Sequence, residues 1–283
     1  MRSLLRKVVP KETRQWIRRQ RRIGRETKAL AKLEVIDCSV GDLGVMDQNK
    51  LNEIFLSKDI DQSWQDLEDQ RNDLNIPDLT GGVNPGDQRA VYYLAKGLKA
   101  GSVLEIGTLI GSSTAYLALA MKDVDHPKIV TVDIDDVNDQ VTKPWLARKS
   151  SKSPRELVSG IIPESAVEFV VDSSIDFMSN CDKKFDLIFL DGDHTAVNVY
   201  REIPLALKLL NPGGVILLHD FFPGNNPLWP LSKKVCPGPF LATNRLENEG
   251  LIVEVLPLGS LPWETKYATN ITSLAILSAK NPK

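Results

Sequence analysis

Acidic residues end five apolar segments in the middle of the chain. The residues at or beside these ends are Glu105, Asp133, Asp172, Asp191 and the pair His219-Asp220. Carboxylates gathered in one place without partners repel one another, so a shared ligand explains the set better than five unrelated strand ends. Hydroxyls, amines and metal ions are the groups that would pair with them. The residue types therefore predict a ligand site built from the ends of neighbouring strands.

The segments themselves predict a parallel sheet. Each is almost continuously apolar and alternates with a helical pattern, which is typical of strands covered on both faces. In an open sheet of this kind, ligands bind beyond the carboxyl ends of the strands. With two further candidates near the end of the chain, we expect an α/β, Rossmann-like doubly wound, mostly parallel seven-stranded sheet with an N-terminal helical cap. The expected strands are 102–106, 128–134, 166–171, 185–191, 213–220, 250–258 and 270–279.

A glycine turn follows the first expected strand, in "SVLEIGTLIGSST" (102–114). Gly107 and Gly111 let the backbone approach a ligand closely, and the helix that follows offers free N–H groups. Their spacing differs from the dinucleotide motif G-x-G-x-x-G. About one strand–helix unit later, Asp133 ends the second strand, where an acid is placed to accept hydrogen bonds from both hydroxyls of a ribose.

Five segments together resemble the class I S-adenosylmethionine (SAM)-dependent methyltransferases. They are "LEIGTLIGSS", "VTVDID", "VEFVVDSS", "IFLDGDHT" and "LLNPGGVILLHDF". The likeness is greatest to the small-molecule O-methyltransferases, which include catechol O-methyltransferase and metal-dependent sugar and natural-product enzymes, and it covers about residues 86–222.

The resemblance implies SAM as the cofactor and assigns residues to its parts. Glu105 would lie near the amino-acid end, with Gly107 and Gly111 giving room, and Ser113 would contact the cofactor's carboxylate. Asp133 would bind the ribose, and Asp191 would lie beside the cofactor. The adenine would lie between Asp172 and Ser173.

The resemblance also implies a divalent cation, magnesium or manganese, held by Asp191 and by Asp220 with its neighbour His219. Relatives usually have Asp, Glu or Asn where this chain has His219, and histidine suits manganese, iron or zinc better than magnesium. His219 is therefore also interpreted as a base or a packed strand-end residue. His194 stands where the catechol enzyme has a lysine base, and we expect it to accept the acceptor's proton. Capping of a helix over 195–210 is the alternative role for His194.

The chain is expected to divide into an N-terminal helical cap or arm (1–85) and a SAM-binding domain (86–283). Within the domain, residues 221–249 are expected to form a substrate lid, and Trp229 is the expected contact to the acceptor. The first 36 residues hold twelve Lys or Arg and three Glu, whereas the whole chain carries a net charge of −2. This basic arm predicts packing on an acidic body or contact with a membrane surface. No nucleic-acid motif accompanies it.

Composition sets the remaining expectations. The chain has three cysteines, Cys38, Cys181 and Cys236, which lie far apart and form no C-x-x-C motif. This pattern indicates a reducing, cytoplasmic location. We expect SAM-dependent methyl transfer to a hydroxyl of a small molecule, such as a step of natural-product biosynthesis, and a homo-oligomer is left open. The alternatives are a metal-independent N- or carboxyl-methyltransferase, and a SAM-binding accessory protein without turnover.

Overall fold

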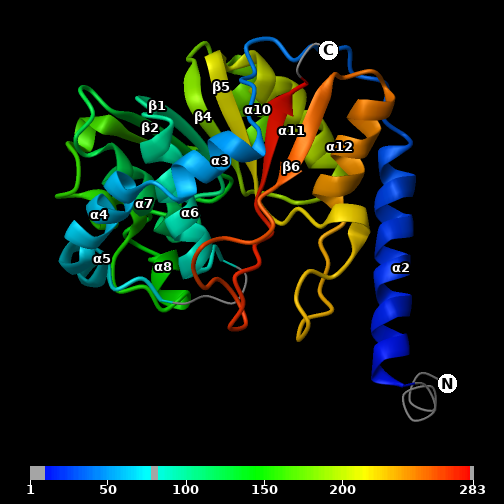
Figure 1. Cartoon of the computed structure of the whole chain (residues 1–283), viewed down its shortest axis with the longest axis horizontal. Coiled ribbons are helices and arrows are strands. Elements are labelled where there is room, and N and C mark those ends of the chain that lie inside the picture. Colours follow the sequence, from blue (N-terminus) through cyan, green and yellow to red (C-terminus); the bar gives the residue numbers. More distant parts are fainter. Residues whose placement is uncertain (1–9, 78–81, 281–283) are drawn as a thin grey trace.

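The computed structural model describes residues 10–77 and 82–280, and one seven-stranded sheet runs through it (Figure 1). The strand order is β3-β2-β1-β4-β5-β7-β6, and β7 runs antiparallel to both of its neighbours while the other pairs are parallel. The predicted doubly wound, mostly parallel sheet is therefore confirmed. The strands are β1 (Ser102–Ile106), β2 (Lys128–Asp133), β3 (Val167–Val171), β4 (Phe185–Leu190), β5 (Leu210–Leu218), β6 (Val253–Pro257) and β7 (Ala275–Ala279).

Helices cover both faces of this sheet. The α-helices are α2 (Lys11–Leu30), α3 (Gln48–Phe55), α4 (Lys58–Asp66), α5 (Glu68–Leu74), α6 (Pro85–Gly97), α7 (Ser112–Met121), α8 (Pro144–Ala147), α9 (Pro154–Val158), α10 (Ser174–Asn180), α11 (Ala196–Lys208) and α12 (Gly238–Asn248), and the short 3₁₀ turns are η1 (Glu164–Ala166) and η2 (Pro223–Asn225). One apolar core joins the sheet to α6 and α7, and a second joins it to α11 and α12. None of the helices within 10–77 and 82–280 combines the length and apolar composition needed to cross a bilayer.

The strand register brings the acidic strand ends into line. Ile106 pairs with Val132 on one side and with Leu190 on the other. Leu190 in turn pairs with Leu218. The residues that directly follow this row are Gly107, Asp133, Asp191 and His219. Asp133, Asp191 and His219 therefore share one edge of the sheet, as the sequence predicted, and Gly107 lies level with them on β1, where Glu105 was expected.

The N-terminal segment does not form one cap over that edge. Helix α2 packs against α11 and α12 on one side of the sheet, whereas α3 and α4 pack against α6 on the other side. Between them the chain crosses near the amino ends of the strands, where Gly44 donates a backbone hydrogen bond to Gly214 at 2.8 Å. The separation follows from the two apolar surfaces that these helices cover, since Leu30 and Leu51 belong to different cores.

The segment predicted as a lid also differs. Its last third is helix α12, whose Ala242 and Leu246 are buried in the core against α11. Its first part folds around a small apolar cluster that buries Trp229. The indole of Trp229 packs edge-on against Phe222 and donates a hydrogen bond to the carbonyl of Ile271 at 3.0 Å. Trp229 therefore anchors the loop, and its expected contact with the acceptor stays a prediction.

Candidate active site

The glycine turn after β1 is required by close packing. A Cβ atom on Gly107 would lie 2.4 Å from the carbonyl oxygen of Asp191, and one on Gly111 would lie 2.8 Å from Pro154. Both residues also have positive φ angles, +98° and +76°, which favour glycine. The turn can therefore pass tightly beside β4 and enter α7, which leaves space above the strand ends.

A cavity of about 540 Å³ occupies that space. This volume is typical of small-molecule and cofactor sites. Among the residues predicted to bind the cofactor, those that line the cavity are Gly107, Ser113, Asp133, Asp172, Ser173 and Asp191. His194 lines it as well, together with Gly82 and Val83 from the segment before α6. Most of the predicted cofactor residues are thus brought together by the fold.

Asp133 lines the cavity, and its carboxylate also accepts hydrogen bonds from the backbone beside the cavity. One carboxylate oxygen accepts a hydrogen bond from the backbone of Leu109 at 2.9 Å, and the other accepts one from Asp135 at 3.1 Å. The next residue, Ile134, is 69% exposed and lines the same cavity, so it offers an apolar surface for a flat ring. Sequence reasoning missed Ile134 because a strand-end isoleucine ordinarily belongs to the core.

Glu105 lies beneath the glycine turn and does not line the cavity. Its Oε2 accepts hydrogen bonds from Thr114 at 2.5 Å and from Thr131 at 2.7 Å, and the side chain is fully buried. Burial raises the pKa of Glu105 to about 7, although these hydrogen bonds and one from Ser113 lower it. Glu105 therefore ties β1 to α7 and β2, and direct contact with the cofactor's amino-acid end is not supported. Gly111 likewise shapes the turn without lining the cavity.

Three side chains that could hold a metal ion, Asp191, His194 and His219, meet beside the cavity, and the first two line it. Asp191 Oδ1 lies 2.6 Å from Nδ1 of His219 and 3.4 Å from Nε2 of His194. One ligand atom from each residue falls within a group whose members are at most 4.8 Å apart. Asp220, the third ligand expected from the sequence, is not a member of this group but lies next to it, with its carboxylate 4.0 Å from His194 Nε2.

Charge interactions inside the group are strong. Burial alone would raise the pKa of Asp191, but the two imidazoles hold it at about 2. Burial alone would lower the pKa of His219, but Asp191 and further carboxylates raise it well above its usual range. Asp191 is therefore ionised and lies between two imidazoles, each of which can carry a positive charge or bind a metal ion.

Comparisons with known proteins agree with this geometry. Residues 104–221 match the family model described as a methyltransferase domain. The matched segment begins within β1 and ends just after β5, so it contains every strand end that lines the cavity.

Two curated relatives of the methyltransferase domain carry specific names. A catechol O-methyltransferase from Niastella koreensis is 26% identical over 138 residues, which is 49% of this chain and 57% of that protein. A rhamnosyl O-methyltransferase from Mycobacterium tuberculosis strain H37Rv is 27% identical over 153 residues, or 54% of this chain and 57% of that protein. The matches therefore span little more than half the length of these relatives.

A solved structure extends the likeness of fold beyond the methyltransferase domain. The O-methyltransferase TomG from Streptomyces achromogenes, in complex with SAM, superposes with a TM-score of 0.51 at 18% sequence identity. The superposition covers 83% of this chain and all of that one. It confirms the Rossmann-like fold.

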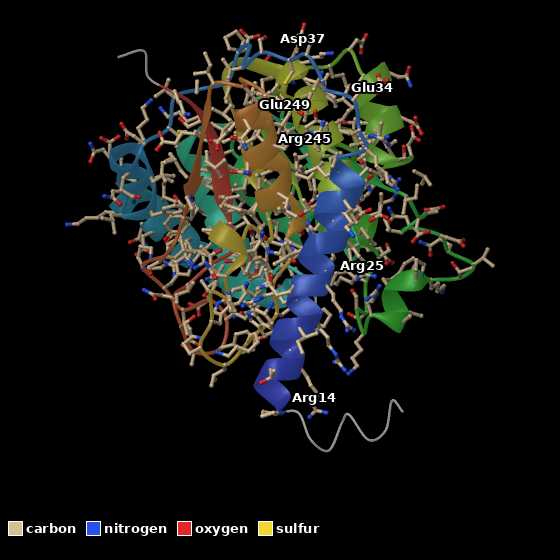
Figure 2. All side chains as sticks on the ribbon, turned by 90° about the vertical axis from the view of Figure 1, so that its right-hand side faces the viewer. Arg14, Arg25, Glu34, Asp37, Arg245 and Glu249 are labelled. Atoms are coloured by element: carbon tan, nitrogen blue, oxygen red, sulfur yellow. The ribbon has the colours of Figure 1, made fainter. Side chains whose placement is uncertain are left out.

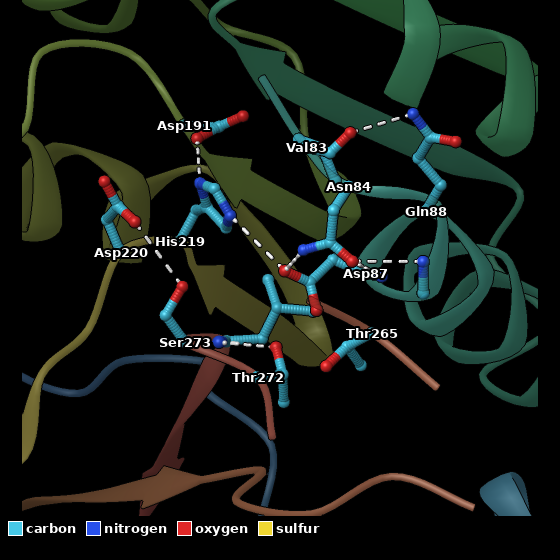
Figure 3. Close-up of polar contacts among 12 residues, drawn as sticks. Val83, Asn84, Asp87, Gln88, Asp191, His219, Asp220, Thr265, Thr272 and Ser273 are labelled. Carbon is cyan, nitrogen blue, oxygen red and sulfur yellow. Dashed lines mark hydrogen bonds and ion pairs between the residues drawn. The ribbon is translucent and has the colours of Figure 1, made fainter. Parts of the chain in front are cut away.

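Asp87 lies beside the Asp191, His194 and His219 group, and sequence reasoning missed it. It lies in the first turn of α6, outside the matched segment, and its side chain is 1% exposed. Its Oδ2 accepts a hydrogen bond from Asn84 at 2.5 Å and lies 3.7 Å from Nε2 of His219, while its Oδ1 has no hydrogen-bond partner among the described residues (Figure 3). The sequence "NPGD" indicates the start of a helix. It does not indicate that Asp87 lies against the end of β5, because that contact depends on how α6 packs on the sheet.

The donor set of the methyltransferase domain fits a divalent cation of the manganese, iron or zinc kind. One carboxylate and two imidazoles converge, and such mixed donors suit these ions better than magnesium. Asp87 stands behind His219 as carboxylates commonly stand behind a metal-binding histidine, where they fix the orientation of the ring.

Proposed function

We propose that this protein is a SAM-dependent O-methyltransferase that acts on a hydroxyl of a small molecule. The observation that carries the proposal is the row of strand-end residues Gly107, Asp133, Asp191 and His219, which share one edge of the sheet beside a cavity in a methyltransferase domain. The names of the curated relatives support transfer to oxygen in place of nitrogen or a carboxyl group.

The cofactor's ribose would bind at Asp133, whose carboxylate already faces the cavity. Ile134 would pack against the adenine ring, with Asp172 and Ser173 at the ring's edge. Ser113, in the first turn of α7, would contact the amino-acid carboxylate, because a helix N-terminus favours a negative group. Methyl transfer then depends chiefly on holding acceptor oxygen and sulfonium in line.

Asp191, His194 and His219 would hold a divalent ion, and Asp220 at the border would orient this group. When bound, such an ion contacts the acceptor's oxygen and lowers the pKa of its hydroxyl. His194 has a second candidate role, since its side chain is 22% exposed and lines the cavity, where it would accept the acceptor's proton. The two roles exclude each other at Nε2, because a nitrogen that binds a metal cannot also take the proton.

The proposal is tested by calorimetric titration with S-adenosylhomocysteine, followed by turnover assays with catechols and with deoxysugar glycosides. Binding together with methylation of a hydroxyl supports it. Binding without turnover of any hydroxylated acceptor favours the accessory role, and absence of binding overturns the proposal. Methyl transfer that EDTA does not inhibit would support the methyltransferase activity and overturn the part of the proposal that assigns a metal ion.

A further inference from the structure

Residues 13–22 of α2 and the loop over 226–236 form a basic, partly apolar tip. In Figure 1 both extend below the sheet, on the side of the loops that follow the parallel strands. Arg22 connects them, since its guanidinium donates a hydrogen bond to the carbonyl of Val235 at 3.4 Å. A shallow cavity between them is lined by Trp16 and Arg19 of the helix and by Pro227 and Lys233 of the loop. The tip is therefore one surface made from two distant parts of the sequence.

The tip carries one sign of charge. Residues 13–22 contain five arginines and residues 226–236 contain two lysines, and neither segment contains Asp or Glu. Beyond the tip, Glu26 of the same helix accepts a hydrogen bond from the backbone of Ala196 in the domain body at 2.9 Å. Within the described residues none of the arginines of 13–22 forms an ion pair. Helix α2 itself packs on α11 and α12, and Figure 2 shows it lying along the outer side of the molecule with Arg14 near the amino end of the helix.

Two large apolar side chains stand among these charges. Trp16 is 55% exposed and Leu231 is 82% exposed. An exposed tryptophan and leucine among cations are the combination that binds the interface of a bilayer with anionic headgroups, where the rings and alkyl groups enter the headgroup region. Single-stranded nucleic acid instead follows a basic groove with stacked aromatics, and a protruding leucine adds nothing to such a site.

We propose that the tip formed by Arg14, Trp16, Arg18, Leu231, Lys233 and Lys234 docks the protein on an anionic lipid bilayer. The loop of the tip follows β5, and Cys236 at its end contacts the carbonyl of His194 at 3.7 Å. Docking therefore turns the carboxyl edge of the sheet, with its cavity, toward the membrane. The proposal concerns a surface outside the cavity and does not depend on the methyl-transfer reaction.

The test is sedimentation of the full chain with vesicles of phosphatidylcholine alone and with vesicles that contain an equal part of phosphatidylglycerol. We expect binding only to the anionic vesicles, weakening as salt is added. The triple variant Arg18→Gln, Lys233→Gln, Lys234→Gln removes three exposed cations of the tip, and its partition coefficient should fall roughly 100-fold, or about fivefold per cation. The matched control is Lys99→Gln, Lys122→Gln, Lys128→Gln, which removes three exposed cations near the opposite edge and should bind as the wild type does.

A second pair of variants tests the apolar part. Leu231→Ser should weaken binding several-fold, whereas Ile252→Ser, at a residue 64% exposed near the start of β6, should not. No binding to anionic vesicles overturns the proposal, and so does equal weakening by the tip and control variants. Tighter binding to a single-stranded or duplex oligonucleotide than to vesicles, lost in the tip variant, would also overturn it and assign the surface to nucleic acid.

Discussion

The carboxylate of Asp191 lies 2.6 Å from Nδ1 of His219 at the carboxyl edge of the sheet. The other nitrogen of the same ring faces the buried Asp87 at 3.7 Å. An imidazole between two carboxylates has little freedom to rotate, because either carboxylate would lose its partner. The pair therefore fixes the direction of one metal-binding nitrogen before any ion arrives, as second-shell carboxylates do in metal sites.

Replacing Asp87 with Asn keeps the shape of the side chain and removes its charge. We expect the affinity for manganese to fall roughly 10–100-fold, since the ring of His219 loses its orienting anion. Titration calorimetry with Mn²⁺ measures this, and binding of S-adenosylhomocysteine should remain near the wild-type value. Glu202→Gln is the matched control, because Glu202 is a buried carboxylate outside the Asp191 group. Equal manganese affinity in Asp87→Asn and wild type would remove Asp87 from the site.

Asp133→Ala should weaken binding of S-adenosylhomocysteine by on the order of 1.5–3 kcal/mol, the contribution of a hydrogen bond to a charged group. Asp133 also accepts a hydrogen bond from Leu109, so a thermal melt must accompany the titration to separate turn stability from ligand contact. Asp135→Ala, two residues along and exposed, is the control and should bind normally. If both variants bind alike, the ribose does not lie at Asp133.

The two roles of His194 give different results on substitution with alanine. As a base, its loss should lower the rate about 10²–10⁴-fold, leave manganese binding intact and remove one ionisation near neutral pH from the rate profile. As a ligand, its loss should lower manganese affinity together with the rate. Asp220→Ala tests the border residue in the same assays, and retained metal dependence in that variant would contradict the ligand set expected from the sequence.

Much of the site was predictable because strand ends are local features. An acid that follows an apolar strand is visible in the sequence, and parallel register alone brings Asp133, Asp191 and His219 to one edge. Asp87 was not predictable in this way, since it arrives from the helix before β1 and meets His219 only through packing of α6 on the sheet. Glu105 shows the opposite error, because its strand-end position looks identical to that of Asp133 while its side chain turns into the interior.

The regions around the sheet were less predictable. Residues 48–74 form three short helices, α3, α4 and α5, and Ser57 caps α4 two residues after α3 ends. Helix α12 was interpreted as part of a lid since prolines and glycines precede it, and its apolar face became meaningful only once α11 was there to cover it. Whether the remaining loop closes over an acceptor stays a prediction, measured by protease cleavage within 221–237 with and without cofactor and acceptor.

The buried carboxyl group of Glu202 should make the free energy of unfolding fall as the pH rises. Its side chain is 2% exposed on α11 and accepts a hydrogen bond from Ser174 at 2.6 Å. Burial raises its pKa from 4.5 to about 7, although Ser174 and the charge of His194 lower it. Below the unfolded pKa the carboxyl is protonated in both states and costs nothing. Between pH 4.5 and about 7 the unfolded chain loses its proton first, which favours unfolding, and above about 7 the penalty is constant.

Glu202→Gln removes this penalty and keeps an acceptor for Ser174. The variant should match the wild type at about pH 4.5 and exceed its free energy of unfolding by up to about 3 kcal/mol at about pH 8, since each pKa unit corresponds to about 1.4 kcal/mol. Urea unfolding across this pH range measures the difference. The control Glu254→Gln changes an exposed carboxylate on β6 and should show no such trend. A constant difference between Glu202→Gln and wild type from about pH 4.5 to about pH 8 would mean that Glu202 does not change its protonation on unfolding.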